Sequence, residues 1–223
     1  MMRKILGEWM RRDDIVVDNY RYKLTDLDSA YIVNPAYEDA LKGWFNPKKG
    51  EVLVDIGANI GKYVIPFAKR GVKVIAIEPN PEFFDVLMKN IKINGVEDNV
   101  KALKLAAGAE KKEVRMYERI FKFPRIVYKP FYANMIPIDE VVDGEDIDWI
   151  KVDVDGGEVE VFKGLEKVLR DNKPRIIAEL HTSTKNQLLR FLHDLGYEDR
   201  LIFRFGTKEN EDLYYYFENV RKE

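Results

Sequence analysis

The chain has no cysteine in its 223 residues. This absence excludes a disulfide framework, a zinc site with cysteine ligands and a cysteine nucleophile. Long apolar segments are absent too, because no stretch approaches the roughly 18 apolar residues that a membrane-spanning helix needs. Residues 1–14 are charged and lack the apolar centre of a signal peptide. We therefore expect a cytoplasmic protein without a membrane partner.

An excess of one charge sign is also missing. The chain has 37 basic and 39 acidic residues and a formal net charge of −2, so nucleic-acid binding would need a local basic patch. Glutamine occurs only at Gln187, whereas Lys, Glu, Ile and Val abound, a composition that leans towards a thermophile. The length suits one large domain or a domain with a small appendage.

The regular part of the chain begins near Gly50, after a turn at residues 46–50. Short apolar or β-branched runs predict strands, and apolar residues at helical spacing predict helices between them. The predicted strands are residues 52–56, 72–77, 100–105, 147–152 and 175–180, and the predicted helices are residues 63–70, 81–94, 159–169 and 183–195. This alternation predicts an α/β fold, in which a mostly parallel sheet has helices on both faces.

Segments at the two ends complete the predicted organisation. Residues 201–205 and 213–217 predict a C-terminal antiparallel hairpin that closes the sheet. Residues 1–48 have a mixed pattern, with a helix expected near residues 38–45. We expect them to form an N-terminal extension that packs on a domain formed by residues 49–223.

A glycine-bearing turn follows the first predicted strand, at Asp55-Ile56-Gly57-Ala58-Asn59-Ile60-Gly61. Ligands of parallel α/β sheets bind at the carboxyl ends of the strands, where this turn lies. Gly57 and Gly61 would allow close approach of the backbone to a ligand. About 20 residues on, Glu78 ends the next strand and is followed by Pro79, which places a carboxylate where a ribose would bind. These coincident features predict a nucleotide-type cofactor site rather than a simple chain reversal.

The chemistry of this turn separates three cofactor classes. A P-loop has four residues between its glycines and then Lys-Ser/Thr, whereas here Lys62 is followed by Tyr63. A nicotinamide site has glycine where this chain has Asp55, and a carboxylate would repel a pyrophosphate. The same carboxylate suits a cofactor with a cationic amino-acid end. The turn therefore predicts S-adenosylmethionine (SAM) as the cofactor.

A second motif, residues 150–158, ends the fourth predicted strand and carries Lys151, Asp153, Asp155 and Glu158. Asp153 lies where the methyl group would be presented, and we predict a direct catalytic role for it, with Lys151 as its orienting partner. Asp155 is expected in the turn. For Glu158 two interpretations remain, a site residue or a carboxylate that stabilises the start of the following helix.

Two histidines and three carboxylates are further candidates for site residues. His181 follows the fifth predicted strand and should open on the crevice, where an imidazole could act as a general base or contact the acceptor. His193 lies within the last predicted helix, where a structural role is expected. Asp153, Asp155 and Glu179 offer hard oxygen ligands, but without a firm ligand spacing, so no metal is predicted.

On these motifs the chain resembles the FkbM family of methyltransferases over roughly residues 50–180. The resemblance implies a class I SAM-methyltransferase (Rossmann-like) fold and usually O-methylation of a hydroxyl, often on a sugar or small natural product. It also implies that Asp55, Gly57, Asn59 and Glu78 face SAM, with Ala107 near the adenine. The motifs that carry the resemblance are residues 54–61 with Tyr63, Ala76-Ile77-Glu78-Pro79, residues 137–141, residues 150–158, Phe162-x-Gly164 and residues 174–179. Where the family usually has Glu-Gly-Ala-Glu, this chain has Asp155-Gly156-Gly157-Glu158.

An insertion separates the two blocks of alternating elements. Residues 113–117 predict an extra strand, but residues 118–137 follow neither period and are expected to form an insertion or lid. Two interpretations remain for it: a lid that stacks on a ring of the acceptor beside an anionic group, or a surface loop with solvated charges. Between Arg119 and Ile138 it holds no acidic residue and mixes basic with aromatic ones, namely Arg119, Lys122, Arg125, Lys129, Phe121, Phe123, Tyr128, Phe131 and Tyr132.

Three functions are compatible with these features. The favoured one is a SAM-dependent methyltransferase that acts on a hydroxyl of a sugar or small molecule. The second is a tRNA methyltransferase whose basic–aromatic insertion binds RNA. The third is a cofactor-binding regulatory domain without an acceptor pocket, which the presence of Asp153, Glu158 and His181 disfavours.

Overall fold

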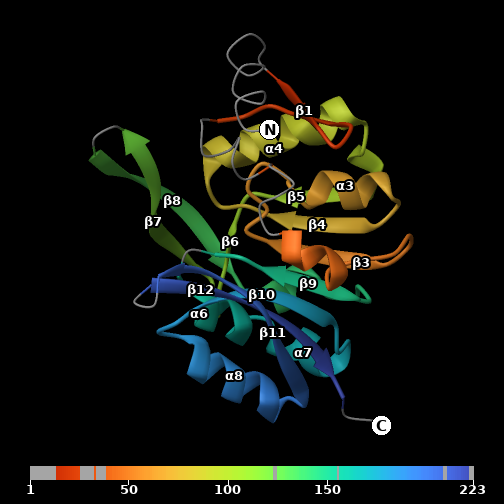
Figure 1. Cartoon of the computed structure of the whole chain (residues 1–223), viewed down its shortest axis with the longest axis vertical. Coiled ribbons are helices and arrows are strands. Elements are labelled where there is room, and N and C mark those ends of the chain that lie inside the picture. Colours follow the sequence, from red (N-terminus) through yellow and green to blue (C-terminus); the bar gives the residue numbers. More distant parts are fainter. Residues whose placement is uncertain are drawn as a thin grey trace.

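The computed structural model describes residues 14–25, 33, 39–122, 125–154, 156–207 and 210–220. Its centre is a seven-stranded sheet that lies between two layers of helices (Figure 1). The sheet strands are β3 (Val52–Ile56), β4 (Lys73–Ile77), β5 (Val100–Leu103), β9 (Trp149–Val152), β10 (Arg175–His181), β11 (Tyr197–Thr207) and β12 (Asn210–Asn219). The helices are α3 (Val64–Lys69), α4 (Pro81–Asn94), α5 (Ile138–Val141), α6 (Glu158–Lys163), α7 (Glu166–Asp171) and α8 (Lys185–Asp194), with 3-10 helices η1 (Asp39–Gly43) and η2 (Glu97–Asn99).

The strand order is β11-β12-β10-β9-β3-β4-β5. β10, β9, β3, β4 and β5 pair in parallel, while β12 is antiparallel to both of its neighbours. The α/β fold with a C-terminal antiparallel hairpin is therefore confirmed. Because the chain moves outward from β3 to β5 and then returns to β9 on the other side of β3, the order reverses between β3 and β9. Ligands of such sheets bind at the carboxyl ends of the strands where the order reverses.

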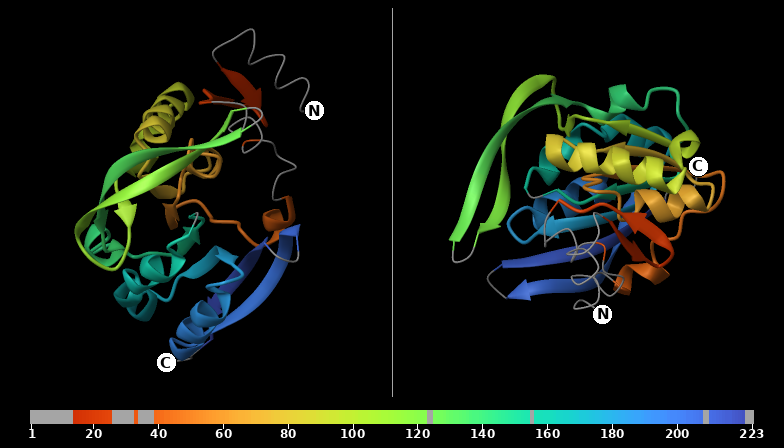
Figure 2. Two further views of the ribbon diagram at one scale, coloured as in Figure 1. Left: turned by 90° about the vertical axis from the view of Figure 1, so that its left-hand side faces the viewer. Right: turned by 90° about the horizontal axis from the view of Figure 1, so that it is seen from above.

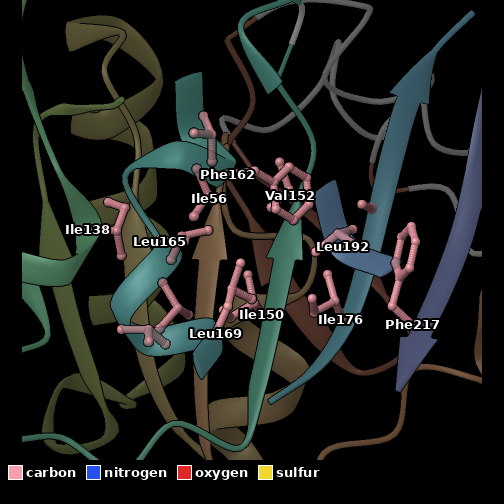
Figure 3. Close-up of a cluster of buried hydrophobic side chains, with 14 of the residues drawn as sticks. Ile56, Ile138, Ile150, Val152, Phe162, Leu165, Leu169, Ile176, Leu192 and Phe217 are labelled. Atoms are coloured by element: carbon pink, nitrogen blue, oxygen red, sulfur yellow. The ribbon is translucent and has the colours of Figure 1, made fainter. Parts of the chain in front are cut away.

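Both faces of the sheet are buried, which explains the nearly continuous apolar runs in its strands. On one face, Ile56, Ile150 and Ile176 pack against Phe162 and Leu192 from α6 and α8 (Figure 3). On the other face, residues such as Leu53, Trp149 and Ile177 belong to a second cluster that includes side chains of α3 and α4. Alternate residues of each strand thus point to opposite layers.

Helix α4 illustrates how local signals set an element. Asn80 caps its first turn, since the Asn80 side chain accepts hydrogen bonds from the backbone N–H groups of Glu82 and Phe83. Pro81 occupies the first turn, where its missing N–H costs no hydrogen bond. Gly95 ends the helix with φ of 58°. The helix predicted at residues 81–94 is confirmed because these signals are all local.

The described part of the N-terminal segment contacts α4. Strands β1 (Ile15–Val17) and β2 (Tyr20–Tyr22) form a small hairpin, and the Asn90 and Asn94 side chains accept hydrogen bonds from the backbone N–H groups of Lys23 and Arg21, at 2.6 and 3.0 Å. The helix predicted near residues 38–45 is the short η1. Most of residues 1–38 lie outside the described part, so the predicted extension stays a prediction.

The predicted insertion at residues 118–137 contributes to a long β-hairpin, and the extra strand predicted at residues 113–117 lies within its first strand. β7 (Lys112–Lys122) and β8 (Arg125–Ile136) pair from Lys112–Met135 to Lys122–Arg125, and β6 (Ala106–Ala107) joins β8. The hairpin stands away from the central sheet (Figures 1 and 2). Residues 127–130 of β8 are exposed on both faces of the hairpin, so burial does not impose apolar alternation there. The lack of a clear period in residues 118–137 therefore did not reveal these strands, and the role of the segment as a lid stays a prediction.

A second difference concerns the helix predicted at residues 159–169, which is divided into α6 and α7. Gly164 ends α6, and a Cβ atom at this position would lie 2.0 Å from the backbone oxygen of Gly108. The chain segment after β6 therefore passes directly against the helix break, a tertiary contact that apolar periodicity does not reveal. Among the described residues, no helix has the length and apolar character to cross a lipid bilayer.

Candidate active site

The turn after β3 packs tightly against the end of β9. The backbone N–H groups of Gly57 and Ala58 both donate to the Ile77 carbonyl at 3.0 Å, which joins the turn to β4. Gly57 has φ of 83°, and a Cβ atom there would lie 1.9 Å from the backbone oxygen of Asp153. Gly61 has φ of 96° and lies close to Leu87. Gly57 thus brings the first motif against the second, while the close approach of Gly57 and Gly61 to a ligand stays a prediction.

Glu78 is buried directly beside this turn, with 5% of its surface exposed. Its two carboxylate oxygens accept hydrogen bonds from the backbone N–H groups of Asn59 and Asn80, both at 2.8 Å. Burial raises the pKa of Glu78 to about 7, and the two N–H donors and Lys151 oppose the rise. Each oxygen accepts one hydrogen bond here and has a second lone pair, so the carboxylate can still accept two hydroxyl groups.

Lys151 connects the two sequence motifs electrostatically. β3 and β9 pair so that Asp55 and Lys151 are directly opposite, and the Lys151 ammonium lies 3.2 Å from the carboxylates of both Asp55 and Asp153. Asp55 and Lys151 are 1% and 3% exposed. The Lys151 ammonium also lies over the Tyr63 ring, 5.4 Å from its centroid. A buried cation therefore holds two carboxylates at the carboxyl edge of the sheet.

Near Asp153 lie Glu179 and two residues that the sequence did not identify as site candidates, Tyr214 and Asp212. Glu179, which had been considered only as an oxygen ligand, lies beside Asp153, because β10 and β9 pair in parallel with Ala178 opposite Val152. It also accepts a hydrogen bond from the Tyr214 hydroxyl. Burial first, then the Asp153 charge, raises the pKa of Glu179 to about 9, with Asp212 contributing. Burial also raises the pKa of Asp212. Tyr214 and Asp212 belong to β12, whose pairing with β10 no local sequence signal indicates.

The remaining candidates are distributed around this centre. His181 ends β10 opposite Asp212, and its Nδ1 lies 2.8 Å from the Ser183 hydroxyl. Asp155 lies outside the described residues. Pro79 follows Glu78, and Ala107 lies in β6 beside Ile136 of β8.

Glu158 and His193 have structural contacts. Glu158 is buried at the start of α6, where its carboxylate accepts hydrogen bonds from the Gly156 N–H and the Thr184 hydroxyl, at 3.2 and 3.4 Å. These contacts favour the helix-start interpretation for Glu158. His193 pairs with Asp199 at 2.6 Å. Within the described ranges, no group of three or more His, Asp or Glu side chains is arranged to hold a metal ion.

The chain is similar to methyltransferases along most of its length. A family model of the methyltransferase FkbM domain matches residues 55–198. Methyltransferase sdnD of Sordaria araneosa is 24% identical over 220 residues, which cover 79% of this chain and 85% of that protein. The tRNA (guanine(37)-N(1))-methyltransferase of Saccharomyces cerevisiae is 30% identical over 110 residues, which cover 47% of this chain but only 21% of that protein.

Solved structures share the fold at lower sequence identity. The methyltransferase FkbM from Methylobacillus flagellatus KT has a TM-score of 0.63 at 20% identity, with 96% of this chain and 58% of that chain covered. TYW2 of M. jannaschii, solved in complex with AdoMet, has a TM-score of 0.55 at 22% identity, with 93% of this chain and 86% of that chain covered. These structures have the class I SAM-methyltransferase fold, which the described sheet matches.

Proposed function

Because the chain belongs to the FkbM family of methyltransferases, we propose that it transfers the methyl group of SAM to a hydroxyl of a sugar or another small molecule. The observation that carries this proposal is the juxtaposition of the buried Glu78 with the Asp55–Lys151–Asp153 group at one edge of the sheet. Both lie at the carboxyl edge, beside the point where the strand order reverses.

The residues at this edge of the sheet fit each chemical group of SAM in turn. Glu78 has spare acceptor capacity for the two ribose hydroxyls, and Asn59 and Pro79 flank it. The backbone of the turn at Gly57 and Gly61 is proposed to face the cofactor, and the Asp55 carboxylate is proposed to favour its cationic amino-acid end. Ala107 is proposed to lie near the adenine, as the family resemblance implies. When bound, SAM supplies an electrophilic methyl group.

The end of the site where the acceptor would bind contains several carboxyl groups, unlike a phosphate-binding site. Asp153, Glu179 and Asp212 lie close enough for their charges to interact. Carboxylates repel phosphates but accept hydrogen bonds from hydroxyls. We assign Asp153 to receive the hydroxyl proton as the new C–O bond forms, with Lys151 orienting it and His181 contacting the acceptor. Holding the acceptor oxygen in line with the methyl group supplies much of the remaining acceleration.

A methyl-transfer assay tests this assignment. We expect label from methyl-tritiated SAM to enter at least one member of a panel of free sugars, glycosides and polyhydroxylated small molecules, with mass spectrometry locating the methyl on oxygen. D153N should lower kcat by about 100-fold or more, the usual range for loss of a general base. SAM binding by D153N should stay within a few-fold of wild type. Transfer to a nitrogen, or full activity of D153N, would contradict the proposal.

The affinity for SAM should depend on pH through Glu78. The ribose hydroxyls bind best to an ionised carboxylate, and the pKa of Glu78 is about 7 without ligand. Below that value, a proton must be released on binding, so the affinity is expected to fall by up to about tenfold per pH unit. Calorimetric titrations between pH 5.5 and 8.5 measure this slope. E78Q should bind more weakly and lose the slope; a slope that survives in E78Q would have another origin.

A second candidate function is methylation of tRNA, and the β7–β8 hairpin is the feature that favours it. Tyr117, Tyr128 and Tyr132 are exposed, and Arg115 pairs with Tyr132 while its guanidinium lies 5.1 Å from the Tyr117 ring centroid. Exposed aromatics beside a cation can stack on bases. Adding tRNA transcripts to the same assay separates the candidates, because binding that weakens steeply with salt and is lost in Y128S/Y132S would favour tRNA.

A further inference from the structure

One face of the central sheet carries a polar row at its carboxyl edge. Side chains alternate along strands, and Leu53, Trp149, Ile177 and Tyr214 all belong to the apolar cluster on the same face. By that alternation, Asp55 of β3, Lys151 of β9 and Glu179 of β10 share this face with Tyr214 of β12. These four strands are consecutive neighbours in the sheet. The row therefore crosses the sheet at the level where the proposed cofactor turn lies.

Contacts make this row continuous. Lys151 bridges Asp55 and Asp153 at 3.2 Å to each. Glu179 lies beside Asp153, one residue beyond the Ala178–Val152 pair of the parallel β9–β10 pairing, and the contact between the two carboxyl groups raises the pKa of Glu179. Tyr214, which is directly opposite Glu179 in the β10–β12 pairing, donates its hydroxyl hydrogen to Glu179. Asp153 thus has two polar neighbours in this row, the Lys151 ammonium group and the Glu179 carboxyl group.

Two carboxyl groups in hydrogen-bond contact cannot both be ionised without strong repulsion, so one of them keeps a proton. Burial, the charge of Asp153 and the more distant Asp212 all favour the proton on Glu179, while the Tyr214 hydroxyl favours its loss. His181 faces Asp212 from the end of β10 and partly offsets its charge. The proton on Glu179 can then be donated to the Asp153 carboxylate.

We propose that Glu179 is a positioning residue whose protonated carboxyl group donates a hydrogen bond to Asp153 and fixes that carboxylate towards the acceptor. The proposal rests on the function proposed above, in which Asp153 receives the acceptor proton. Glu179 keeps its own proton throughout. Tyr214 holds the opposite oxygen of Glu179, so the hydroxyl and Lys151 together set the orientation of the pair.

The proton on Glu179 can be measured without knowing the acceptor. In protein labelled with ¹³C at the Glu side-chain carboxyl carbon, E179Q identifies the Glu179 signal by its loss. We expect a wild-type pKa near 9. D153N should lower the pKa of Glu179 by at least about one unit because it removes a neighbouring negative charge. Y214F should raise it, because the hydroxyl stabilises the ionised form.

The two variants shift the pKa of Glu179 in opposite directions, which a merely structural role does not require. A Glu179 that titrates near its ordinary value, or a pKa that D153N leaves unchanged, would overturn the shared proton. Both results are independent of turnover, so they separate this inference from the proposed function. If the shared proton is confirmed but D153N is fully active, the proposed function has failed, and the positioning role in catalysis fails with it.

Rescue by a conservative variant tests the positioning role in catalysis, with an acceptor identified in the methyl-transfer assay. E179Q keeps an N–H donor towards Asp153 and an acceptor for Tyr214, so its kcat should stay within about threefold of wild type near neutral pH. E179L has no donor and should lose about 100-fold in kcat, the scale of an angstrom-sized misplacement, with KM for SAM unchanged. Equal loss in both variants would contradict positioning by hydrogen bonding.

Discussion

Replacing Lys151 by methionine is expected to lower the free energy of unfolding by about 3–5 kcal/mol, the usual cost of removing one partner from a buried ion pair. Lys151 is 3% exposed, and its ammonium group contacts the carboxylates of Asp55 and Asp153. Methionine fills a similar volume, so the loss reports the missing charge rather than a cavity. Urea denaturation of wild type and K151M measures the difference.

The double variant D55N/K151M tests whether the Asp55 carboxylate causes most of the loss in unfolding free energy expected for K151M. In D55N/K151M the most deeply buried carboxylate is neutral, so we expect the double variant to be more stable than K151M alone. K167M serves as the surface control, since Lys167 contacts Asp143 and Asp171 only at exposed positions. Its effect should stay within about 0.5 kcal/mol. Equal stability of K151M and K167M would show that the buried ion pairs do not stabilise the fold.

The role of Lys151 shows how far a sequence can lead. Its place beside Asp153 in the second motif marked it as a candidate orienting residue. Its contact with Asp55 depends on the alignment of β3 with β9, strands that are about 95 residues apart in the chain. Such a register is set by the packing of the whole sheet, so only the structure reveals that Lys151 joins the two motifs.

Elements with local signals were predictable, and elements held by tertiary contacts were not. The α4 boundaries follow from Asn80, Pro81 and Gly95, and the glycine turn follows from its position between a strand and a helix. Tyr214 was missed as a site residue, and Glu179 was considered only as an oxygen ligand, since their contact arises from the antiparallel β10–β12 pairing. Only the strand at residues 113–117 of the β7–β8 hairpin was predicted, because its two strands pair mainly with each other and residues 127–130 are exposed.

Replacing Gly57 by alanine is expected to weaken SAM binding by about 100-fold, which corresponds to about 2.7 kcal/mol. The new Cβ atom would lie 1.9 Å from the backbone oxygen of Asp153, so the turn or the end of β9 must move. Either movement disturbs the hydrogen bonds of Gly57 and Ala58 to Ile77 and shifts Asp153 from the position proposed for it at the methyl end of SAM. The clash and the positive φ together should also lower the free energy of unfolding by about 3 kcal/mol.

Gly95 provides the matched control for this substitution. Like Gly57 it has a positive φ, but nothing lies within 4 Å of a Cβ atom added there. G95A therefore carries only the backbone cost, about 1 kcal/mol of stability, and should bind SAM as wild type does in calorimetric titration. The comparison separates steric contact at the turn from general loss of stability. If G57A folds and binds SAM as tightly as G95A, the turn is not the cofactor site, and the assignment of Asp153 to the methyl end loses its geometric basis.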